Sequence, residues 1–518
     1  MPRRVRDKIA LLFAINEVVL ILILCSIRSA RYYGNTALYQ DVFTSYLCLT
    51  KFAQRGEPPQ AVAKPPVSAK QARTLTRSHF ALPLTSYLLP LTSYQLTQVV
   101  VIQPSTAIML DFNLLEILRL CGWWLASILS VFGLLLSLWI VVPAPTFSLL
   151  PLGVCAPELS PWLIAIEAVA LMLAVLTNKS DWFSLAIVCS FLGLCLSLLP
   201  LIQFPATERL FKAEIERVLG TDYLEHIPQA IKDKMRSKPL VIADVFRGIS
   251  YPNIRINRGL VFASPNGVDL KLNTYQPLTT GKHPTLIIIY GGAWRTGSPS
   301  SYEQFSSYMA AQGYTAIAID YRHAPQYKFP KQLEDVETAI EYIQTHADDL
   351  EVDLDRIAIM GRSAGGHLGT LAAYKQKTIR FKAIVNYYAP VDLADGYDDL
   401  PSPDPIGVRT ILENFIGGSP TEEPELYHQA SLTTYLKADS PPSLLIYPSR
   451  DHLVQAKFGR GLYEKLKATD NPGILLEIPW AEHAFDAVFF GVSNQLALYY
   501  TERFLAFQMR GCKDEACF

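Results

Sequence analysis

Charged residues are scarce in this 518-residue sequence, and neither sign dominates. Only 18% of the residues are Asp, Glu, Lys or Arg, and the formal net charge at pH 7 is -1. Proteins that hold nucleic acid through its phosphates present a strongly basic face, which a weakly charged and balanced chain does not supply. We therefore expect no nucleic-acid partner.

Cysteine is also rare, and none occurs between Cys195 and Cys512. The sequence has no H-E-x-x-H motif and no pair of C-x-x-C motifs, which are common signatures of zinc sites. We therefore expect no metal and no cofactor. Cys512 and Cys517 could form a disulfide only outside the cytosol. Four other cysteines lie in apolar stretches, where packing is their expected role: Cys25, Cys121, Cys189 and Cys195.

Apolar residues, by contrast, make up half of the chain and are concentrated in its first two-fifths. A helix needs about 20 residues to cross roughly 30 Å of hydrocarbon. Four apolar stretches reach or approach this length, at residues 9–27, 120–142, 162–176 and 182–202. They predict a membrane region over residues 1–206, with a linker at 28–113. We expect a multi-pass membrane protein in contact with the lipid bilayer.

Two features of this membrane region stay open. The basic flank and apolar centre of residues 9–27 suit an uncleaved anchor, which we favour, or a cleaved signal peptide. The stretch at 162–176 is short, carries Glu167, and is joined to 182–202 by a polar turn, which predicts a membrane hairpin. Lys and Arg occur both before the first stretch and throughout the linker. The positive-inside rule therefore does not decide which side holds the C-terminal part.

After residue 207 the sequence alternates short apolar runs with helical patterns. It predicts a helix at 207–220 and a hairpin whose turn is Pro-Asn-Gly at 265–267. Further strands are expected at 285–290, 315–320, 356–360, 383–388, 444–447 and 474–478, and helices at 302–312, at 330–347 and from 365. This alternation predicts an α/β domain over residues 207–518, in which helices cover both faces of a mainly parallel sheet.

The stretch AIMGRSAGGHLGT places one hydroxyl, that of Ser363, in a G-x-S-x-G motif between a predicted strand and a predicted helix. At such a sharp turn the strand and the helix approach each other closely, which is why Gly361 and Gly365 flank the serine. The turn exposes the hydroxyl above the sheet, and the helix N-terminus favours developing negative charge there. Ser363 is thus a candidate nucleophile; a plain helix cap is the alternative.

A serine hydroxyl becomes a strong nucleophile when a base takes its proton and an acid orients that base. In proteins with this motif the chain order is serine, acid, histidine. Asp451 follows the strand at 444–447 within PSRDHLV, and His483 follows the strand at 474–478 within PWAEHAF. Both lie at the sheet edge expected to hold Ser363. We therefore predict a triad of Ser363, Asp451 and His483.

Other residues compete for these roles, and Asp451 could instead be a solvated surface residue. The alternative acids are Asp486, Glu482 and Asp392. His452 precedes the last strand, and His367 lies one turn into the helix after Ser363, where packing or capping is expected. No histidine follows His483 in the sequence, which favours it as the base.

Acyl transfer also needs donors for an oxyanion, because N–H groups aimed at the developing charge commonly supply a factor of about a hundred to a thousand in rate. The loop YGGAWRTGS follows the run at 285–290, and its paired glycines let the backbone approach a bound carbonyl. We predict an oxyanion hole formed by the N–H groups of Gly291, Gly292 and Ala364. A simple turn is the alternative.

Five sequence blocks occur in a telling order: IIIYGGAWRTGS, AIDYRHAPQYKFPKQLEDV, IAIMGRSAGGHLG, PPSLLIYPSRDHLV and PWAEHAFD. Over residues 253–507 the chain resembles the α/β-hydrolase superfamily, in the esterase/lipase branch related to hormone-sensitive lipase, feruloyl and acetyl-xylan esterases, and kynurenine formamidase. The resemblance implies an α/β-hydrolase fold. It places the family's nucleophile, acid, base and oxyanion donors at Ser363, Asp451, His483, Gly291, Gly292 and Ala364.

The sequence departs from that family's pattern in two places. In the oxyanion loop, Tyr290 stands where the family usually has His, and Ala293 replaces its third glycine. Beside the nucleophile, Arg362 stands where an acidic residue is frequent. The backbone donors survive these changes. The change at Tyr290 puts in question a hydrogen bond that steadies the loop. Arg362 puts in question the polarity of the pocket.

The resemblance implies a two-step hydrolysis of a carboxylic ester through an acyl-enzyme. The substrate is then a small-molecule ester or an acyl lipid, and the membrane region favours an apolar one. Residues 392–440 interrupt the strand and helix alternation and are expected to form a partial lid. An amide hydrolase of the peptidase or formamidase kind, and a non-catalytic membrane scaffold, are the alternatives. The presence of all three triad residues argues against the scaffold.

Overall fold

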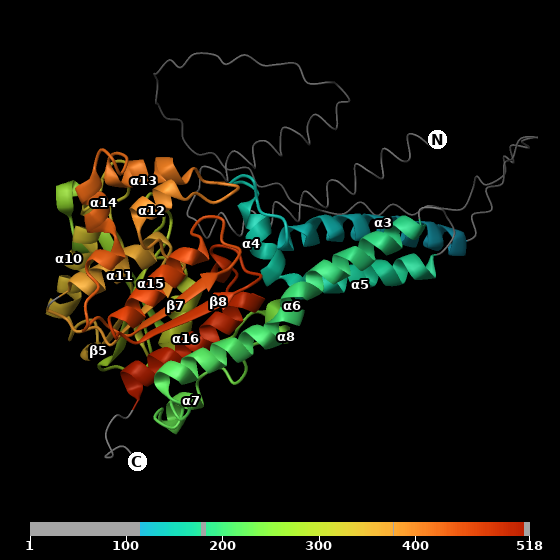
Figure 1. Ribbon diagram of the computed structural model, residues 1–518. Helices are drawn as coiled ribbons and strands as arrows, with labels where there is room; N and C mark the ends of the chain where they lie inside the picture. Colours follow the sequence, from blue (N-terminus) through green and yellow to red (C-terminus); the bar gives the residue numbers. More distant parts are fainter. Residues whose placement is uncertain (1–113, 178–182, 377, 512–518) are drawn as a thin grey trace, which may run out of the picture. The chain divides into compact units, whose positions relative to one another are not determined.

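A computed structural model of the chain describes residues 114–177, 183–376 and 378–511 (Figure 1). The apolar stretch at 9–27, the linker at 28–113, Cys25, Cys512 and Cys517 lie outside these described residues. The described part from Arg119 onward belongs to one compact unit. Its structure positions the candidate site.

An eight-stranded sheet forms the centre of the C-terminal part, in the order β1-β2-β4-β3-β5-β6-β7-β8. Its strands are β1 (Arg255–Ala263), β2 (Leu270–Gln276), β3 (His283–Ile289), β4 (Thr315–Ile319), β5 (Val352–Arg362), β6 (Ala383–Tyr387), β7 (Ser443–Pro448) and β8 (Gly473–Ile478). The two pairs that involve β2 are antiparallel, and all other neighbours are parallel. The predicted α/β fold with a mainly parallel sheet is confirmed.

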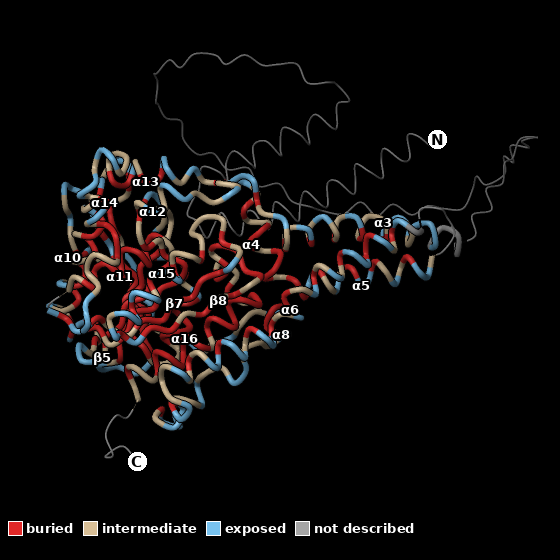
Figure 2. Tube along the Cα trace, viewed as in Figure 1, coloured by how far each residue is buried: buried red, intermediate tan, exposed pale blue. Residues whose placement is uncertain are grey.

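The inner strands are buried on both faces, which explains why their sequences are continuous apolar runs. The helices that cover the sheet are α9 (Glu303–Ala311), α10 (Lys331–Thr345), α11 (Ala364–Lys375), α15 (Ala456–Ala468) and α16 (Val492–Arg510). α10 and α11 pack together, and both α11 and α16 contact β5 and β6. In Figure 2 the deepest burial follows the sheet and α16.

Three apolar helices precede this domain: α3 (Leu114–Ser137), α5 (Ser160–Leu176) and α6 (Phe183–Leu219). Ala126, Ala174 and Ala186, one from each helix, pack in a common cluster (Figure 1). Two segments, Arg119–Ile140 and Leu185–Leu219, are long and apolar enough to cross a membrane. The pair formed by α4 (Leu150–Glu158) and α5, which is bent by 79°, would be a third if it is counted as one span.

Two features of these helices differ from the sequence-based expectation. α4 was not expected, because its nine residues contain two prolines and a glycine, which obscure a helical pattern. The predicted segments at 182–202 and 207–220 form one helix, although Pro200 and Pro205 lie inside it. A proline removes a single N–H donor, so that a helix held by packing can continue through it. The polar turn at 178–182 lies outside the described residues.

The three apolar helices expose large hydrophobic side chains on their outer surfaces (Figure 2). They include Leu125, Val131, Leu135, Val169, Met172, Val175, Val188, Phe191 and Ile202. Small and polar contacts occur between the helices beside larger apolar ones, for example the hydrogen bond of 2.8 Å between the Ser137 and Ser197 hydroxyls. Glu167 is buried beside Gly133 and Gly193. Small residues inside and apolar residues outside are typical of helices packed in lipid.

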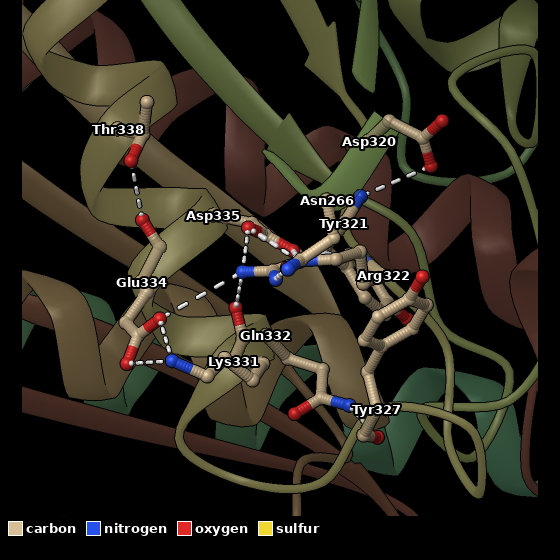
Figure 3. A network of polar contacts seen from close by, with 10 residues as sticks. All are labelled: Asn266, Asp320, Tyr321, Arg322, Tyr327, Lys331, Gln332, Glu334, Asp335 and Thr338. Carbon is tan, nitrogen blue, oxygen red and sulfur yellow. Dashed lines mark hydrogen bonds and ion pairs between the residues drawn. The ribbon is translucent and has the colours of Figure 1, made fainter. Parts of the chain in front are cut away.

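A buried ion pair joins the segment after β4 to α10 (Figure 3). Both the N–H and the guanidinium of Arg322 donate to the Asp335 carboxylate, at distances between 2.6 and 3.0 Å. The two side chains are only 4% and 3% exposed. Nearby, Lys331 and Glu334 form a second ion pair, but its side chains are 47% and 43% exposed.

Removal of the buried acid should destabilise the protein far more than removal of the exposed base. Asp335→Ala removes the buried partner of the Arg322 guanidinium and leaves it only the Glu334 carboxylate, which lies 3.7 Å away and is 43% exposed. We expect the free energy of unfolding to fall by about 3–5 kcal/mol. Lys331→Ala is the control, with an expected change below about 1 kcal/mol. Urea unfolding of the detergent-solubilised protein, followed by tryptophan fluorescence, measures both. Similar small changes in the two variants would contradict this assignment.

Candidate active site

Ser363 lies at a strained turn between β5 and α11. Its backbone angles are φ 50° and ψ -124°, a region that residues other than glycine rarely adopt. A Cβ atom at Gly361 would lie 2.2 Å from the Gly365 carbonyl oxygen, and one at Gly365 would lie 2.3 Å from the Ile289 carbonyl oxygen. The flanking glycines are therefore required by the close approach of backbone. The turn leaves the Ser363 side chain partly exposed at the C-terminal edge of the sheet.

The loops after β7 and β8 bring two further predicted residues to this serine. His483 Nε2 lies 3.0 Å from Ser363 Oγ, and His483 Nδ1 lies 2.7 Å from Asp451 Oδ2. When Nδ1–H donates to the carboxylate, Nε2 is left to accept the serine proton. Three residues from distant parts of the chain thus form one continuous line of hydrogen bonds.

The Asp451 carboxylate is held by its own loop as well as by the histidine. Its Oδ1 accepts the N–H groups of Leu453 and Val454 at 2.8 and 2.7 Å. Burial raises the pKa of Asp451, whereas the neighbouring His483 and the Val454 N–H act in the opposite direction. Contacts to the charged form favour it. Asp451 is therefore shielded from water, while His483 and the backbone N–H groups stabilise its ionised carboxylate.

The alternative acids and the alternative base are engaged elsewhere. Asp392 caps a short helix, where its side chain accepts two backbone N–H groups. Glu482 accepts the N–H groups of His452 and His483, at 2.8 and 2.9 Å, and pairs with the His452 ring. Asp486 belongs to a separate buried network. The structure therefore brings Asp451, rather than these three, to the His483 ring.

His367 is fully buried and packs between two segments. Its Nδ1 accepts the Trp294 indole N–H at 3.3 Å, and its Nε2 lies 2.6 Å from the Ala430 carbonyl oxygen, to which it donates. Burial lowers the pKa of His367 from 6.5 to about 4. It is therefore a neutral packing residue at ordinary pH.

The loop after β3 lies directly beside the serine. A Cβ atom at Gly291 would lie 3.1 Å from the Ser363 Cβ. Among the backbone hydrogen bonds of the described turns and loops, none uses the N–H groups of Gly291, Gly292 or Ala364 as donors. The oxyanion hole at these three N–H groups stays a prediction.

Tyr290, at the start of this loop, forms hydrogen bonds with the segment after β4. Its hydroxyl donates to Asp320 Oδ1 at 2.5 Å and lies 2.9 Å from His323 Nε2. Its ring stacks on that of Tyr321, with 4.5 Å between the ring centroids. The tyrosine therefore anchors the start of the loop to the segment after β4.

Arg362 does not line a pocket, because it is fully buried. Its Nε donates to Asp486, whose other carboxylate oxygen accepts the Tyr388 hydroxyl. The Tyr388 ring lies 4.6 Å from the His483 ring, centroid to centroid. Two more rings flank the guanidinium at 4.3 and 4.4 Å, those of Tyr302 and Phe305. Arg362 thus links the serine turn to the segment after the histidine, a role that the sequence did not indicate.

The predicted lid, residues 392–440, contains α12 (Leu393–Asp398), α13 (Val408–Ile416) and α14 (Pro424–Ala430). Phe415 of α13 stacks on Trp294 in the loop after β3, with ring centroids 4.2 Å apart. The Ala430 carbonyl, at the end of α14, meets His367. The segment therefore contacts both the loop after β3 and the helix after Ser363.

Comparison with known proteins shows which proteins this region is similar to. Residues 272–466, which include Ser363 and Asp451, match the BD-FAE family. The chain is similar to the probable carboxylic ester hydrolase LipM of Mycobacterium tuberculosis, with 33% identity over 224 residues, 40% of this chain and 50% of that protein. Esterase LipC of the same organism is 32% identical over 225 residues, 40% of this chain and 55% of that protein. The chain thus spans about half the length of these curated relatives. An esterase structure from Thermogutta terrifontis, Est2, is 25% identical, with a TM-score of 0.38, over 48% of this chain and 90% of that one.

Because His367 is buried, we predict that it contributes to the loss of stability of the folded protein in acid. The unfolded chain takes up a proton near pH 6.5, whereas the folded protein does so only near pH 4. The free energy of unfolding should therefore fall as the pH decreases from about 6.5 to about 4, by up to about 3 kcal/mol from this group. His367→Gln should remove that component, whereas His428→Gln, at an exposed position on α14, should keep it. Urea unfolding at several pH values measures the slopes; equal slopes for wild type and His367→Gln would refute the prediction.

Proposed function

We propose that the protein is a membrane-anchored serine hydrolase that cleaves carboxylic esters, because residues 272–466 match the BD-FAE family and the chain is similar to a carboxylic ester hydrolase and an esterase. The observation that carries this proposal is the line of hydrogen bonds from Ser363 through His483 to Asp451, at 3.0 and 2.7 Å. The names of the two mycobacterial relatives, an ester hydrolase and an esterase, support the same reaction.

In the first step Ser363 Oγ attacks the ester carbonyl carbon while His483 Nε2 accepts the hydroxyl proton. The carbonyl oxygen becomes an oxyanion, which the N–H groups of Gly291, Gly292 and Ala364 would stabilise. The carbon–oxygen bond to the alcohol then breaks, and His483 returns the proton to the leaving alkoxide. The products of this step are a free alcohol and an acyl group bound to Ser363.

The second step repeats this chemistry with water. His483 takes a proton from the water, whose oxygen attacks the acyl carbonyl, and the bond to Ser363 Oγ breaks as the proton passes to the serine. A carboxylic acid leaves and the hydroxyl is restored. Asp451 stays ionised throughout, orients the imidazole and stabilises its charged form. Every proton is exchanged among the substrate, water and these side chains.

The apolar helices support attachment to a bilayer. Segments Arg119–Ile140 and Leu185–Leu219 are long enough to span it, and their outer surfaces expose apolar side chains. With the stretches at 9–27 and 162–176, these segments would make the protein multi-pass. A hydrolase held in this way meets esters that partition into lipid at high local concentration. We therefore favour an acyl lipid or another apolar ester as substrate.

Loss of the nucleophile should abolish turnover without loss of the fold. For Ser363→Ala we expect kcat for 4-nitrophenyl butyrate to fall by about 10⁴-fold or more, because the acyl-enzyme cannot form. Asp451→Asn should lose a similar factor, since the imidazole is then held in the wrong tautomer. Steady-state assays of the detergent-solubilised full-length protein measure both. Hydrolysis that persists in Ser363→Ala would sink the mechanism.

A graded series of 4-nitrophenyl esters, from soluble acetate to micellar long-chain esters, tests the substrate class. We expect kcat/KM to rise with acyl length by about tenfold or more, since each buried CH₂ contributes about 0.8 kcal/mol of binding. Equal rates along the series would count against an acyl lipid. Matched acyl anilides are the comparison set, and their turnover at rates near those of the esters would assign an amide hydrolase instead.

A further inference from the structure

The segment that joins the apolar helices α3 and α5 lies against the proposed active site. We term residues 139–158 the elbow. It contains the end of a short 3₁₀ helix (Leu138–Ile140), the loop after it, and α4, and it ends where the bend of 79° turns the chain into α5. α4 contacts α16 and the turn Phe485–Ala487, which begins two residues after His483. The elbow is therefore next to the base loop.

The loop that carries the acid is attached to the elbow on both sides of Asp451. The Arg450 guanidinium, on one side, donates to the Val141 carbonyl oxygen. Leu453, on the other side, packs on the elbow's apolar cluster of Ala144, Leu150 and Val154. The N–H group of Leu453 is also one of the two backbone donors to the Asp451 carboxylate. A shift of the elbow would thus move the acid.

The loop that carries the base is attached through a buried glutamate. Glu158 is fully buried, and its carboxylate accepts the Ser493 N–H at 2.8 Å in the first turn of α16. The Ser493 hydroxyl in turn accepts the indole N–H of Trp480 at 2.9 Å, three residues before His483. An acceptor oxygen at a helix N-terminus satisfies an N–H group that has no partner inside the helix. Glu158, Ser493 and Trp480 thus form a chain of contacts from the elbow to the base loop.

The fit around Glu158 is close. A Cβ atom at Gly491 would lie 2.3 Å from the Glu158 carboxylate oxygen, so that only glycine lets the helix start approach it. Asn494, one residue beyond Ser493, donates to the Phe489 carbonyl oxygen at 2.6 Å and so holds the segment just before α16 against the start of this helix. The carboxylate is therefore built into the start of α16 and not merely adjacent to it.

We propose that the elbow is a positioning element of the active site: Glu158 and the Val141 carbonyl hold the base and acid loops so that His483 is aligned between Asp451 and Ser363. This inference rests on the hydrolase function proposed above. Catalytic groups must be placed within a fraction of an ångström, and a displacement near 1 Å can cost about a hundredfold in rate. Neither Asp451 nor His483 lies in a helix or strand, so the contacts with the elbow add to the hydrogen bonds within their own loops.

Glu158→Ala in the full-length protein tests the base side, with 4-nitrophenyl butyrate as substrate in detergent micelles. We expect kcat to fall by about 10- to 100-fold while KM changes by less than about threefold, because alignment is lost and not binding. Glu158→Gln keeps an acceptor oxygen for the Ser493 N–H, so it should restore kcat to within about threefold of wild type. Wild-type kcat in Glu158→Ala would overturn the proposal.

Glu167→Ala is the matched control for Glu158→Ala. Glu167 is also buried, nine residues further along, but it packs beside Gly133 and Gly193 of the apolar helices and not against the hydrolase domain. We expect its kcat to stay within about twofold of wild type. A loss equal to that of Glu158→Ala would overturn the proposal, because the effect would then follow from damage to the helix bundle in general.

Arg450→Met tests the acid side independently and does not depend on the folding of the Glu158 variants. It keeps the aliphatic stem but removes the hydrogen bond to the elbow. We expect a lower kcat together with a shifted pH profile of kcat/KM, since the Asp451 contact to His483 is altered. A folded Arg450→Met protein with wild-type kcat and an unchanged profile would overturn the proposal.

Labelling of Ser363 by a fluorophosphonate separates this inference from the proposed function. Wild-type protein that neither hydrolyses any ester nor reacts with the probe would refute the function itself. Wild-type reactivity, with equal labelling rates in Glu158→Ala and Arg450→Met, would refute only the role of the elbow. Slower labelling in these two variants, and not in Glu167→Ala, would support it.

Discussion

The close approach of β5 and α11 at Ser363 is the constraint on which the rest of the site depends. Carbonyl groups of Gly365 and Ile289 occupy the space where side chains at Gly361 and Gly365 would lie. This crowding forces Ser363 into its strained conformation and directs its hydroxyl outward at the sheet edge. The parallel order of the strands then brings the loops after β7 and β8 to the same edge. The meeting of Ser363, His483 and Asp451 at one sheet edge thus follows from the packing of the backbone.

Buried charges lie at the points where these loops leave the sheet. Arg322 with Asp335 and Arg362 with Asp486 are ion pairs that hold segments near the C-terminal strand ends, and all four residues are nearly inaccessible to solvent. Such pairs lose hydration and gain little stability over apolar residues of similar size. What they supply is a fixed geometry, because a charge with one well-placed partner has few alternative positions. The site is thus fixed by directional contacts around it and not by its apolar core alone.

The sequence predicted the parts of the fold that depend on short-range pattern. The apolar runs located the strands, and G-x-S-x-G between a strand and a helix located the turn at Ser363. It did not predict α4, whose prolines mask its helical pattern, nor the unbroken α6. The link from Arg362 to Asp486 and the support from Glu158 also escaped detection. Both join residues more than a hundred positions apart, and neither has a local signature, although Asp486 stands only three residues after His483.

The continuity of α6 has a mechanical consequence. A helix of 37 residues is about 55 Å long, and this one passes from the apolar bundle into contact with α16 and β8 without an intervening loop. A flexible tether would let a hydrolase tumble above the lipid and sample many orientations. In the membrane-anchored hydrolase proposed above, a continuous helix packed at both ends would instead fix the height and tilt of the sheet edge that carries Ser363. Such a protein would reach only those esters that lie within a narrow layer of the membrane–water interface.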